Sequence, residues 1–326
     1  MPAIGNYPTR VGVRFVLAVC LMLALAAPAL AQNLDKVRLS IADLSFTFLP
    51  HLLARDTGIF RKYGLDVELI YIGGPVGLTA LATGDLDYSA SPDPGLLAVA
   101  KGLPFKVVML TTQSPPFYVI GRPNIKRAAD LAGKKYGISR IRSSSYFVSK
   151  VIFQKLGVDA DKITFIQAGS NANRVLALST GSIDGAMFSM PTAQEMVKKG
   201  FMQLGSPKEV GQRPHGGLLV RIERIEKNRE QVKRMAAALI ESMAFIANNR
   251  AKAAEYVSGK FKIERDFAEQ LLGGDYLSML TMDGRMTEEG VQAYLDEAFQ
   301  NNLVPNRFSA KQALDLSLLE AAPGKR

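Results

Sequence analysis

The chain has 326 residues, with 40 Lys and Arg against 30 Asp and Glu, and a formal net charge of +10 at pH 7. One Cys and two His are too few for a zinc cluster, and the sequence contains no phosphate-binding glycine loop, no dinucleotide fingerprint and no G-x-S-x-G nucleophile turn. This scarcity of nucleophile and base pairs favours binding without turnover, so we expect no enzyme activity, no cofactor and no metal.

The first 31 residues have the pattern of a secretory signal peptide. Arg10 and Arg14 precede an apolar run at 15–27, and small residues at 29 and 31 mark a cleavage site. The apolar run is shorter than the roughly 20 residues of a membrane span. Export with cleavage is therefore favoured over an N-terminal anchor or a lipid anchor at Cys20, and we expect a periplasmic protein.

Cleavage after residue 31 would remove the single Cys and lower the net charge from +10 to +8, because Arg10 and Arg14 leave with the signal. Disulfides are then excluded even in an oxidising compartment. Basic residues are mixed with acidic ones, as in 223–234, without the basic stripe of nucleic-acid-binding proteins. We expect a solvated surface with a modest attraction for anions, and no nucleic-acid partner.

Strand and helix patterns alternate from the start of the mature chain. Period-two patterns or short apolar runs predict strands at 37–42, 65–72, 87–90 and 106–110. Amphipathic stretches between them predict helices at 48–63, 75–82 and 94–100. This β-α-β alternation predicts an α/β fold with a mostly parallel sheet covered by helices.

One segment of this pattern occurs twice. The sequence ALATGDLD at 80–87 returns as ALSTGSID at 177–184, and each copy predicts a helix ending at a Gly, a tight turn and a short buried strand. The second copy lies among further predicted elements: strands at 118–121, 136–139, 164–166, 183–188 and 217–220, and helices at 146–156, 173–179 and 192–199. An α/β unit built twice predicts two similar lobes with a ligand cleft between them.

The remaining third of the chain is almost entirely helical. A long helix is predicted at 226–249, with Val232, Met235, Leu239 and Phe245 on one side, and about three more helices follow up to residue 319. This part contains neither copy of the repeat, so we expect it to pack around the first lobe.

Four stretches carry a family resemblance: 53–69, with the pattern A-x-x-x-G-x-F-x-x-x-G-L-x-V, and 83–87, 130–137 and 181–186. In these the chain resembles the periplasmic substrate-binding proteins of ABC importers, in the branch of sulfonate, taurine and nitrate binders and of relatives of thiamine-pyrimidine-precursor proteins. The resemblance implies a two-lobe, type II fold in which each lobe is a mostly parallel sheet flanked by helices.

The resemblance also implies lobe boundaries and partners. Lobe 1 would comprise 32–120 and 221–326, and lobe 2 would comprise 121–220. The chain would cross near 117–122 and 214–221, and closure around ligand would be a hinge motion at those crossings. A permease and ATPase complex at the membrane would be the partner, and we expect a monomer.

Ligand-contacting residues are expected just beyond the carboxyl ends of strands, near helix N-termini. Three consecutive serines before a predicted helix form the best anion site, because free backbone N–H groups and the helix dipole favour a carboxylate or sulfonate there. The alternative is that Ser144 or Ser145 is only an N-cap. The candidate ligand-binding residues are Ser45, Phe46, Thr47, Gly74, Pro75, Ser91, Asp93, Phe117, Arg142, Ser143, Ser144, Ser145, Tyr146, Asn171, Ser189 and Met190.

Several candidates have two interpretations. Phe46, Phe117 and Tyr146 could wall an apolar ligand or simply pack, and Arg142, like its neighbour Arg140, could pair with an anion or be solvated. Asp93 is unfavourable in a strict anion site, so it would bind an amine or a hydroxyl, or cap the helix that follows. Of the two histidines, His51 is expected to pack in a helix, and His215 lies in a turn-rich crossing segment.

The sequence therefore predicts a periplasmic solute-binding protein that delivers a small organic anion, of sulfonate, taurine or carboxylate type, to a permease. A binder of a pyrimidine or other aromatic heterocycle is one alternative, and a ligand-sensing module for a membrane partner is another. An enzyme of the related pyrimidine-precursor type is disfavoured, because the resemblance assigns those enzymes a His- and Cys-containing iron site and the mature chain has no Cys.

Overall fold

The computed structural model describes residues 33–319, without the side chain of residue 275. From Asp35 onward the chain forms one compact unit, and the fold below is that of this unit. The predicted signal peptide lies outside the described residues. Among the residues described, no helix is both long and apolar enough to cross a membrane.

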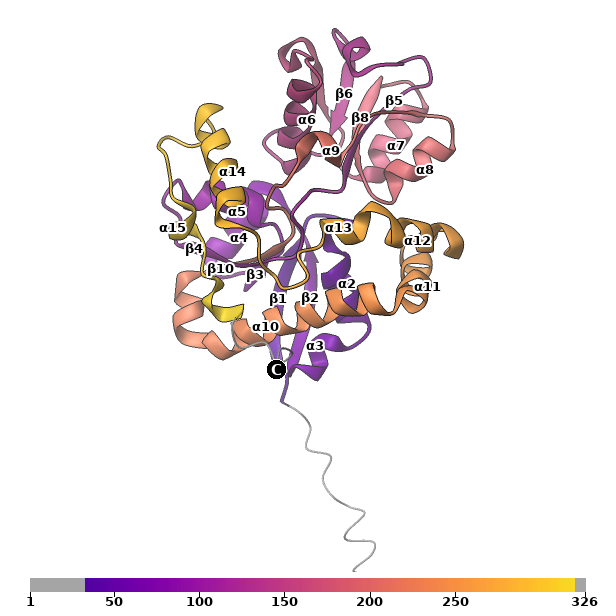
Figure 1. The fold of residues 1–326 in the computed structure, drawn as a ribbon. Coiled ribbons are helices and arrows are strands. Elements are labelled where there is room, and N and C mark those ends of the chain that lie inside the picture. The colour runs from indigo at the N-terminus through magenta and orange to yellow at the C-terminus, as the bar shows by residue number, and fades with distance from the viewer. Residues whose placement is uncertain (1–32, 320–326) are drawn as a thin grey trace, which may run out of the picture. The chain divides into compact units, whose positions relative to one another are not determined.

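A five-stranded sheet begins the fold (Figure 1), with the strand order β2-β1-β3-β10-β4. β1 runs parallel to β2 and β3, whereas β10 is antiparallel to both β3 and β4, so four of the five strands point the same way. The strands are β1 (Asp35–Ile41), β2 (Leu65–Tyr71), β3 (Tyr88–Ser89), β4 (Phe105–Leu110) and β10 (Gly217–Arg221).

The second sheet repeats this plan with the order β7-β6-β8-β5-β9. β6 is parallel to β7 and β8, and β5 is antiparallel to β8 and β9. The strands are β5 (Phe117–Gly121), β6 (Lys135–Ile138), β7 (Thr164–Gln167), β8 (Gly185–Ser189) and β9 (Met202–Gly205). The predicted fold class, two mostly parallel sheets flanked by helices, is confirmed. We call the parts built on the first and second sheets lobe 1 and lobe 2.

The fourth strand of each sheet is the one that the chain enters after crossing from the other sheet. β5 belongs to lobe 2 and β10 belongs to lobe 1. The lobe boundaries expected from the sequence, 120/121 and 220/221, would instead place nearly all of β5 in lobe 1 and nearly all of β10 in lobe 2. The crossing segments are 111–116 and 211–216. Short apolar strands of five residues have no feature that shows which sheet they join, which explains the difference.

Helices cover both sheets and include two departures from the predicted pattern. The single helix predicted at 48–63 is interrupted at Gly58, whose φ of 78° is left-handed, and β9 was not predicted. The α-helices are α2 (Leu49–Asp56), α3 (Ile59–Lys62), α4 (Gly74–Thr83), α5 (Pro92–Val99), α6 (Ser144–Lys155), α7 (Asn171–Ser179), α8 (Thr192–Lys198), α9 (Pro207–Val210), α10 (Ile222–Asn248), α11 (Arg250–Phe261), α12 (Arg265–Leu271), α13 (Leu277–Met279), α14 (Glu288–Gln300) and α15 (Ala310–Ala313). Single-turn segments are η1 (Phe46–Phe48), η2 (Ala128–Leu131), η3 (Ala160–Lys162), η4 (Leu272–Tyr276) and η5 (Leu316–Leu319).

The C-terminal helices belong to lobe 1, as the sequence predicts. α10 packs against α2, β10 and β4, α14 against α5, and α15 and η5 against β4. Val232, Met235 and Leu239 of α10 are fully buried, and Phe245 packs partly buried against the same core. This burial anchors the returning half of the chain to the first sheet.

The two copies of the repeated sequence form the same structure. Gly84 and Gly181 both adopt left-handed backbone, with φ of 89° and 78°. The following aspartates play the same part, since Asp87 Oδ2 accepts a hydrogen bond from the Arg38 N–H at 2.7 Å and Asp184 Oδ2 accepts one from the Lys135 N–H at 3.1 Å. Each carboxylate thus ties the turn to the neighbouring parallel strand.

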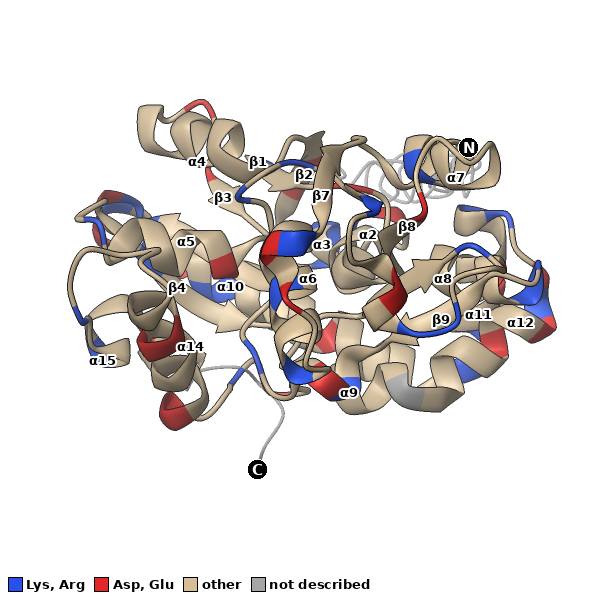
Figure 2. Cartoon of the chain, turned by 90° about the horizontal axis from the view of Figure 1, so that it is seen from above, with Lys and Arg blue, Asp and Glu red and all other residues tan. Residues whose placement is uncertain are grey.

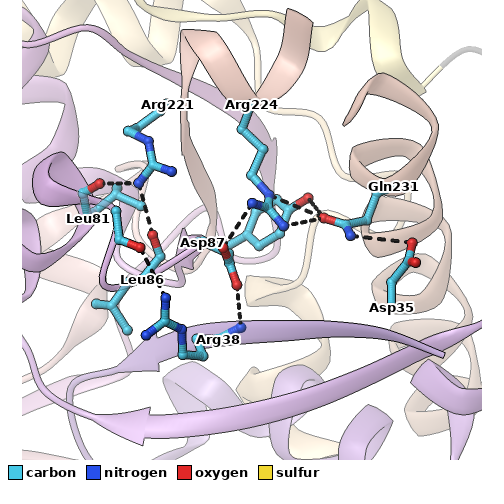
Figure 3. Close-up of polar contacts among 10 residues, drawn as sticks. Asp35, Arg38, Leu81, Leu86, Asp87, Arg221, Arg224 and Gln231 are labelled. Carbon is cyan, nitrogen blue, oxygen red and sulfur yellow. Dashed lines mark hydrogen bonds and ion pairs between the residues drawn. The ribbon is translucent and has the colours of Figure 1, made fainter. Parts of the chain in front are cut away.

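An arginine at or just after the end of each crossing strand lies against the turn, and Figure 3 shows the one in lobe 1. Arg221, the last residue of β10, donates from Nη1 to the carbonyls of Leu81 and Leu86 at 2.5 and 3.0 Å. In lobe 2, Arg122 directly follows β5, and its guanidinium lies so close to Gly181 that a Cβ there would be 3.1 Å from Nη1. These turns lie at the amino ends of β3 and β8. The repeated sequence is therefore at the opposite end of each sheet from the loops that follow the carboxyl ends of the strands.

Candidate ligand-binding site

A cavity of about 270 Å³ lies among residues of both lobes and the crossing segments. Its lining comes largely from the loops after the carboxyl ends of β1, β2, β3, β6 and β7, where ligands bind in open α/β sheets. The lining residues are Ala42, Asp43, Thr47, Phe48, Tyr71, Ile72, Gly73, Gly74, Ser91, Asp93, Pro94, Phe117, Ser139, Arg140, Ser143, Ser144, Ser145, Gly169, Ser170, Arg174 and His215.

The structure brings half of the predicted site residues together in this lining. They come from both lobes, although they are up to a hundred residues apart in sequence. These residues are Thr47, Gly74, Ser91, Asp93, Phe117, Ser143, Ser144 and Ser145. Their contact with a ligand stays a prediction.

The other eight predicted residues do not line the cavity. Phe46 is fully buried, with its ring edge-on to Phe261 and Tyr276. Arg142 and Tyr146 line a different cavity, which borders α6 and α14. The remaining five are Ser45, Pro75, Asn171, Ser189 and Met190. A position after a strand end is therefore not sufficient, because the rotation of each loop decides which side chain faces the cavity.

Two of these excluded residues support the site from behind. Asn171 Nδ2 donates to Ser189 Oγ at 2.9 Å, and Asn171 Oδ1 accepts a hydrogen bond from Arg174 Nη2 at 2.6 Å. This chain of contacts connects β8 to the first turn of α7 and fixes one edge of the Arg174 guanidinium.

The serine-rich turn forms a hydroxyl cluster at the start of α6. Ser139, Ser143 and Ser145 lie within hydrogen-bond distance of one another, at 2.8–2.9 Å between their Oγ atoms. Ser143 is the N-cap residue rather than Ser144 or Ser145, and its side chain makes no capping bond to the first turn. The Ser143 side chain therefore does not occupy the N–H groups of the first turn, and anion binding there stays a prediction.

Arg174 is the most informative residue that sequence reasoning missed. It is only 3% exposed, and its Nε and Nη1 atoms have no hydrogen-bond partner among the described residues. Burial lowers the pKa of the Arg174 guanidinium, an effect that the nearby Asp43 carboxylate opposes, but a guanidinium stays charged in proteins. Arg174 is thus a buried cation with two unsatisfied donors in the wall of the cavity.

A signal for Arg174 is present in the sequence. It lies four residues before Leu178, the fully buried residue of α7, and therefore on the face that the helix turns toward the protein. A lone arginine on a buried helix face differs from one on a solvated face, but a helix of nine residues with Leu176 exposed makes that face hard to recognise in the sequence.

His215 was placed only in a crossing segment, yet it is also part of the cavity wall. Its Nδ1 atom lies 3.4 Å from Asp93 Oδ2, and its ring is edge-on to Phe117 with centroids 5.1 Å apart. His51, by contrast, packs inside α2 as predicted: it is fully buried, and its Nε2 atom lies 3.0 Å from the Gly217 carbonyl.

Outside the cavity, charged residues of both signs are mixed along the described part of the chain. Figure 2 shows acidic and basic residues on the same helices, such as α9 and α12, which fits a solvated surface. Within residues 33–319, no group of three or more His, Cys, Asp or Glu side chains could hold a metal ion.

The comparisons with known proteins agree with the fold. Residues 45–253, more than half of the chain, match the family model described as NMT1/THI5 like. The chain belongs to the NMT1/THI5-like family.

Individual relatives are more distant. A protein of Brucella abortus (strain 2308), provisionally named as a binding protein, is 28% identical over 285 residues, which cover 83% of this chain and 88% of that protein. A solved structure from Bordetella bronchiseptica RB50 superimposes with a TM-score of 0.77 at 23% identity, covering 89% of this chain and 97% of the other.

A second solved structure is the alkanesulfonate-binding protein SsuA from Xanthomonas axonopodis pv. citri, bound to MOPS. It has a TM-score of 0.72 at 18% identity and covers 87% of this chain and 98% of that one. At these identities the two solved structures show that the fold is shared.

Proposed function

We propose that this member of the NMT1/THI5-like family is the substrate-binding protein of an ABC importer and captures a small organic anion in its interlobe cavity. The observation that supports an anionic ligand is the position of Arg174. It is a buried guanidinium in the cavity wall, and its Nε and Nη1 atoms lack partners among the described residues. Family membership and the fold shared with an alkanesulfonate-binding protein support the transport role.

The anion would be held by three groups that meet in the cavity wall. Arg174 would supply two charge-assisted hydrogen bonds, the hydroxyls of Ser143 and Ser145 would supply neutral donors, and the N-terminus of α6 would add its dipole. Each hydrogen bond to a charged group contributes about 1.5–3 kcal/mol. Two such bonds correspond to a change in Kd of roughly two to four orders of magnitude.

The remaining features of the cavity fit binding without chemistry. Among the described contacts, the side chains of the cavity serines bond to one another, to Asp93 or to nearby backbone groups, and none bonds to His215. The arrangement therefore lacks the nucleophile and base contact of a hydrolase. We propose a monomer in the periplasm that hands its ligand to a permease and ATPase complex.

An aromatic heterocycle, such as a pyrimidine, is the second candidate ligand. The observation in its favour is the set of aromatic walls, because Phe48, Tyr71 and Phe117 all line the cavity and could stack on a flat ring. The experiment that follows includes both ligand classes.

The test is a thermal-shift screen of residues 32–326 with ethanesulfonate, taurine, nitrate, benzoate and a pyrimidine. A ligand present at 100 times its Kd stabilises the folded protein by about 2.7 kcal/mol. We expect an organic anion to raise the Tm of the wild type and of the Arg142→Gln control, which removes an exposed arginine outside the cavity lining, but not that of Arg174→Gln. A shift by the pyrimidine alone, or a full anion shift in Arg174→Gln, would contradict the proposal.

A further inference from the structure

A second polar group faces the same cavity from elements that do not hold Arg174. Asp93 lies in the first turn of α5, and His215 lies in the crossing segment before β10. The two residues are 6% and 4% exposed. Asp93 Oδ2 accepts a hydrogen bond from Ser144 Oγ at 2.5 Å and lies 3.4 Å from His215 Nδ1. Both lobes and a crossing segment therefore contribute to this group.

Two atoms of the pair remain unsatisfied. Asp93 Oδ1 and His215 Nε2 are buried and have no hydrogen-bond partner among the described residues. We assign the His215 proton to Nδ1, because that nitrogen faces the Asp93 carboxylate, and this leaves Nε2 as an acceptor in the neutral ring. The pair thus offers two acceptors, and a buried carboxylate oxygen without a donor is unfavourable.

We infer that Asp93 and His215 form a second subsite, which receives a hydrogen-bond donor of the ligand, an ammonium or a hydroxyl group, while Arg174 receives its acidic group. The inference rests on the proposed function and narrows the substrate class to small organic acids that carry an amino or hydroxyl group. The charges of the lining agree, since the arginines Arg140 and Arg174 are matched by Asp43 and Asp93. A zwitterion complements such a cavity better than a simple anion does.

The same geometry selects against simple anions. A ligand with an acidic group and an alkyl tail would leave Asp93 Oδ1 unpaired and would bring negative charge toward its carboxylate. Sites built to pair with a polar group reject analogues that lack it far more strongly than apolar pockets reject a missing methylene. We therefore expect at least a tenfold difference in Kd between ligands that differ only in the donor group.

The experiment is titration calorimetry of residues 32–326 with two matched series. The sulfonates are taurine, 2-hydroxyethanesulfonate and ethanesulfonate, and the carboxylates are β-alanine, 3-hydroxypropionate and propionate. In at least one series, we expect the amino or hydroxy compound to bind at least ten times more tightly than the plain acid. The variant Asp93→Asn, which keeps the size of the side chain, should reduce that ratio at least tenfold for the amino compound, and His215→Gln should reduce it in the same direction.

The ratio of two Kd values in one preparation does not depend on the fraction of folded protein, which calorimetry reports separately as the stoichiometry. A plain acid that binds as tightly as its amino and hydroxy counterparts would overturn the second subsite and leave the anion site standing. An unchanged ratio in both Asp93→Asn and His215→Gln would also overturn it. If the wild type binds no compound of either series, both the subsite and the proposed capture of a small organic anion are wrong.

Discussion

Replacing Arg174 with Met is expected to stabilise the ligand-free protein and to abolish anion binding. Two buried donors without partners each cost about 1–3 kcal/mol, and Met fills much of the same volume without polar atoms. The change also removes the hydrogen bond to Asn171 and the contact of the guanidinium with the Phe188 ring at 5.7 Å, together roughly 2–4 kcal/mol. The midpoints of these two ranges differ by about 1 kcal/mol, so we expect a net gain of about 1 kcal/mol in the free energy of unfolding.

The assay is urea unfolding of residues 32–326, followed by circular dichroism, with and without the ligand found in the screen. A gain of this size corresponds to a rise in Tm of about 2–4 °C for a chain of this length. Arg140→Met is the matched control, because it removes an exposed arginine from the same cavity and should leave the stability within about 0.5 kcal/mol. A loss of more than about 1 kcal/mol in ligand-free Arg174→Met, or a ligand response equal to that of the wild type, would refute the reasoning.

Two further predictions concern stability. Burial lowers the pKa of His51 to about 4 from an ordinary value of 6.5. As the pH falls from 6.5 to 4, this histidine is protonated in the unfolded chain but stays neutral in the folded protein, so the free energy of unfolding decreases. Urea unfolding at pH 7 and pH 4.5 should show that His51→Gln, which can still donate to the Gly217 carbonyl, loses roughly 2 kcal/mol less than the wild type; an equal loss would contradict the buried neutral ring. In the repeat, Asp87→Asn should cost about 1 kcal/mol more than Asp184→Asn, because Asp87 also pairs with Arg224 at 2.8 Å between side chains that are mostly buried; equal costs in the same assay would argue against a stabilising pair.

Local patterns predicted the elements well because their causes are local. The Gly in each copy of the repeat requires left-handed backbone, and both Gly84 and Gly181 adopt it. The alternation of short apolar runs with amphipathic stretches was sufficient to predict β-α-β units. Three serines in a row predicted a helix start at residue 146, and α6 begins two residues earlier, at Ser144.

The site features that the sequence did not reveal depend on contacts between distant segments. Arg174 and Asp43 come from different lobes, and Asp93 meets both Ser144 and His215 only after the chain has crossed twice. The spacing of Arg174 and Leu178 is only a weak signal on a helix of nine residues, because the segments that bury the arginine lie outside any short window of sequence. The expected boundaries assigned β5 and β10 to the wrong sheets for the same reason. The sheet that a strand joins is decided by partner strands about a hundred residues away.

The position of β10 also sets the order in which the chain can complete its two halves. The second sheet uses only residues 117–205, so all of its strands can pair as soon as that stretch has been synthesised or translocated. The first sheet has β10 between β3 and β4, and must wait for residues 217–221, although three of its strands were made before residue 90. During synthesis or translocation from the N-terminus, the segment that comes first in the chain is therefore the last to be finished.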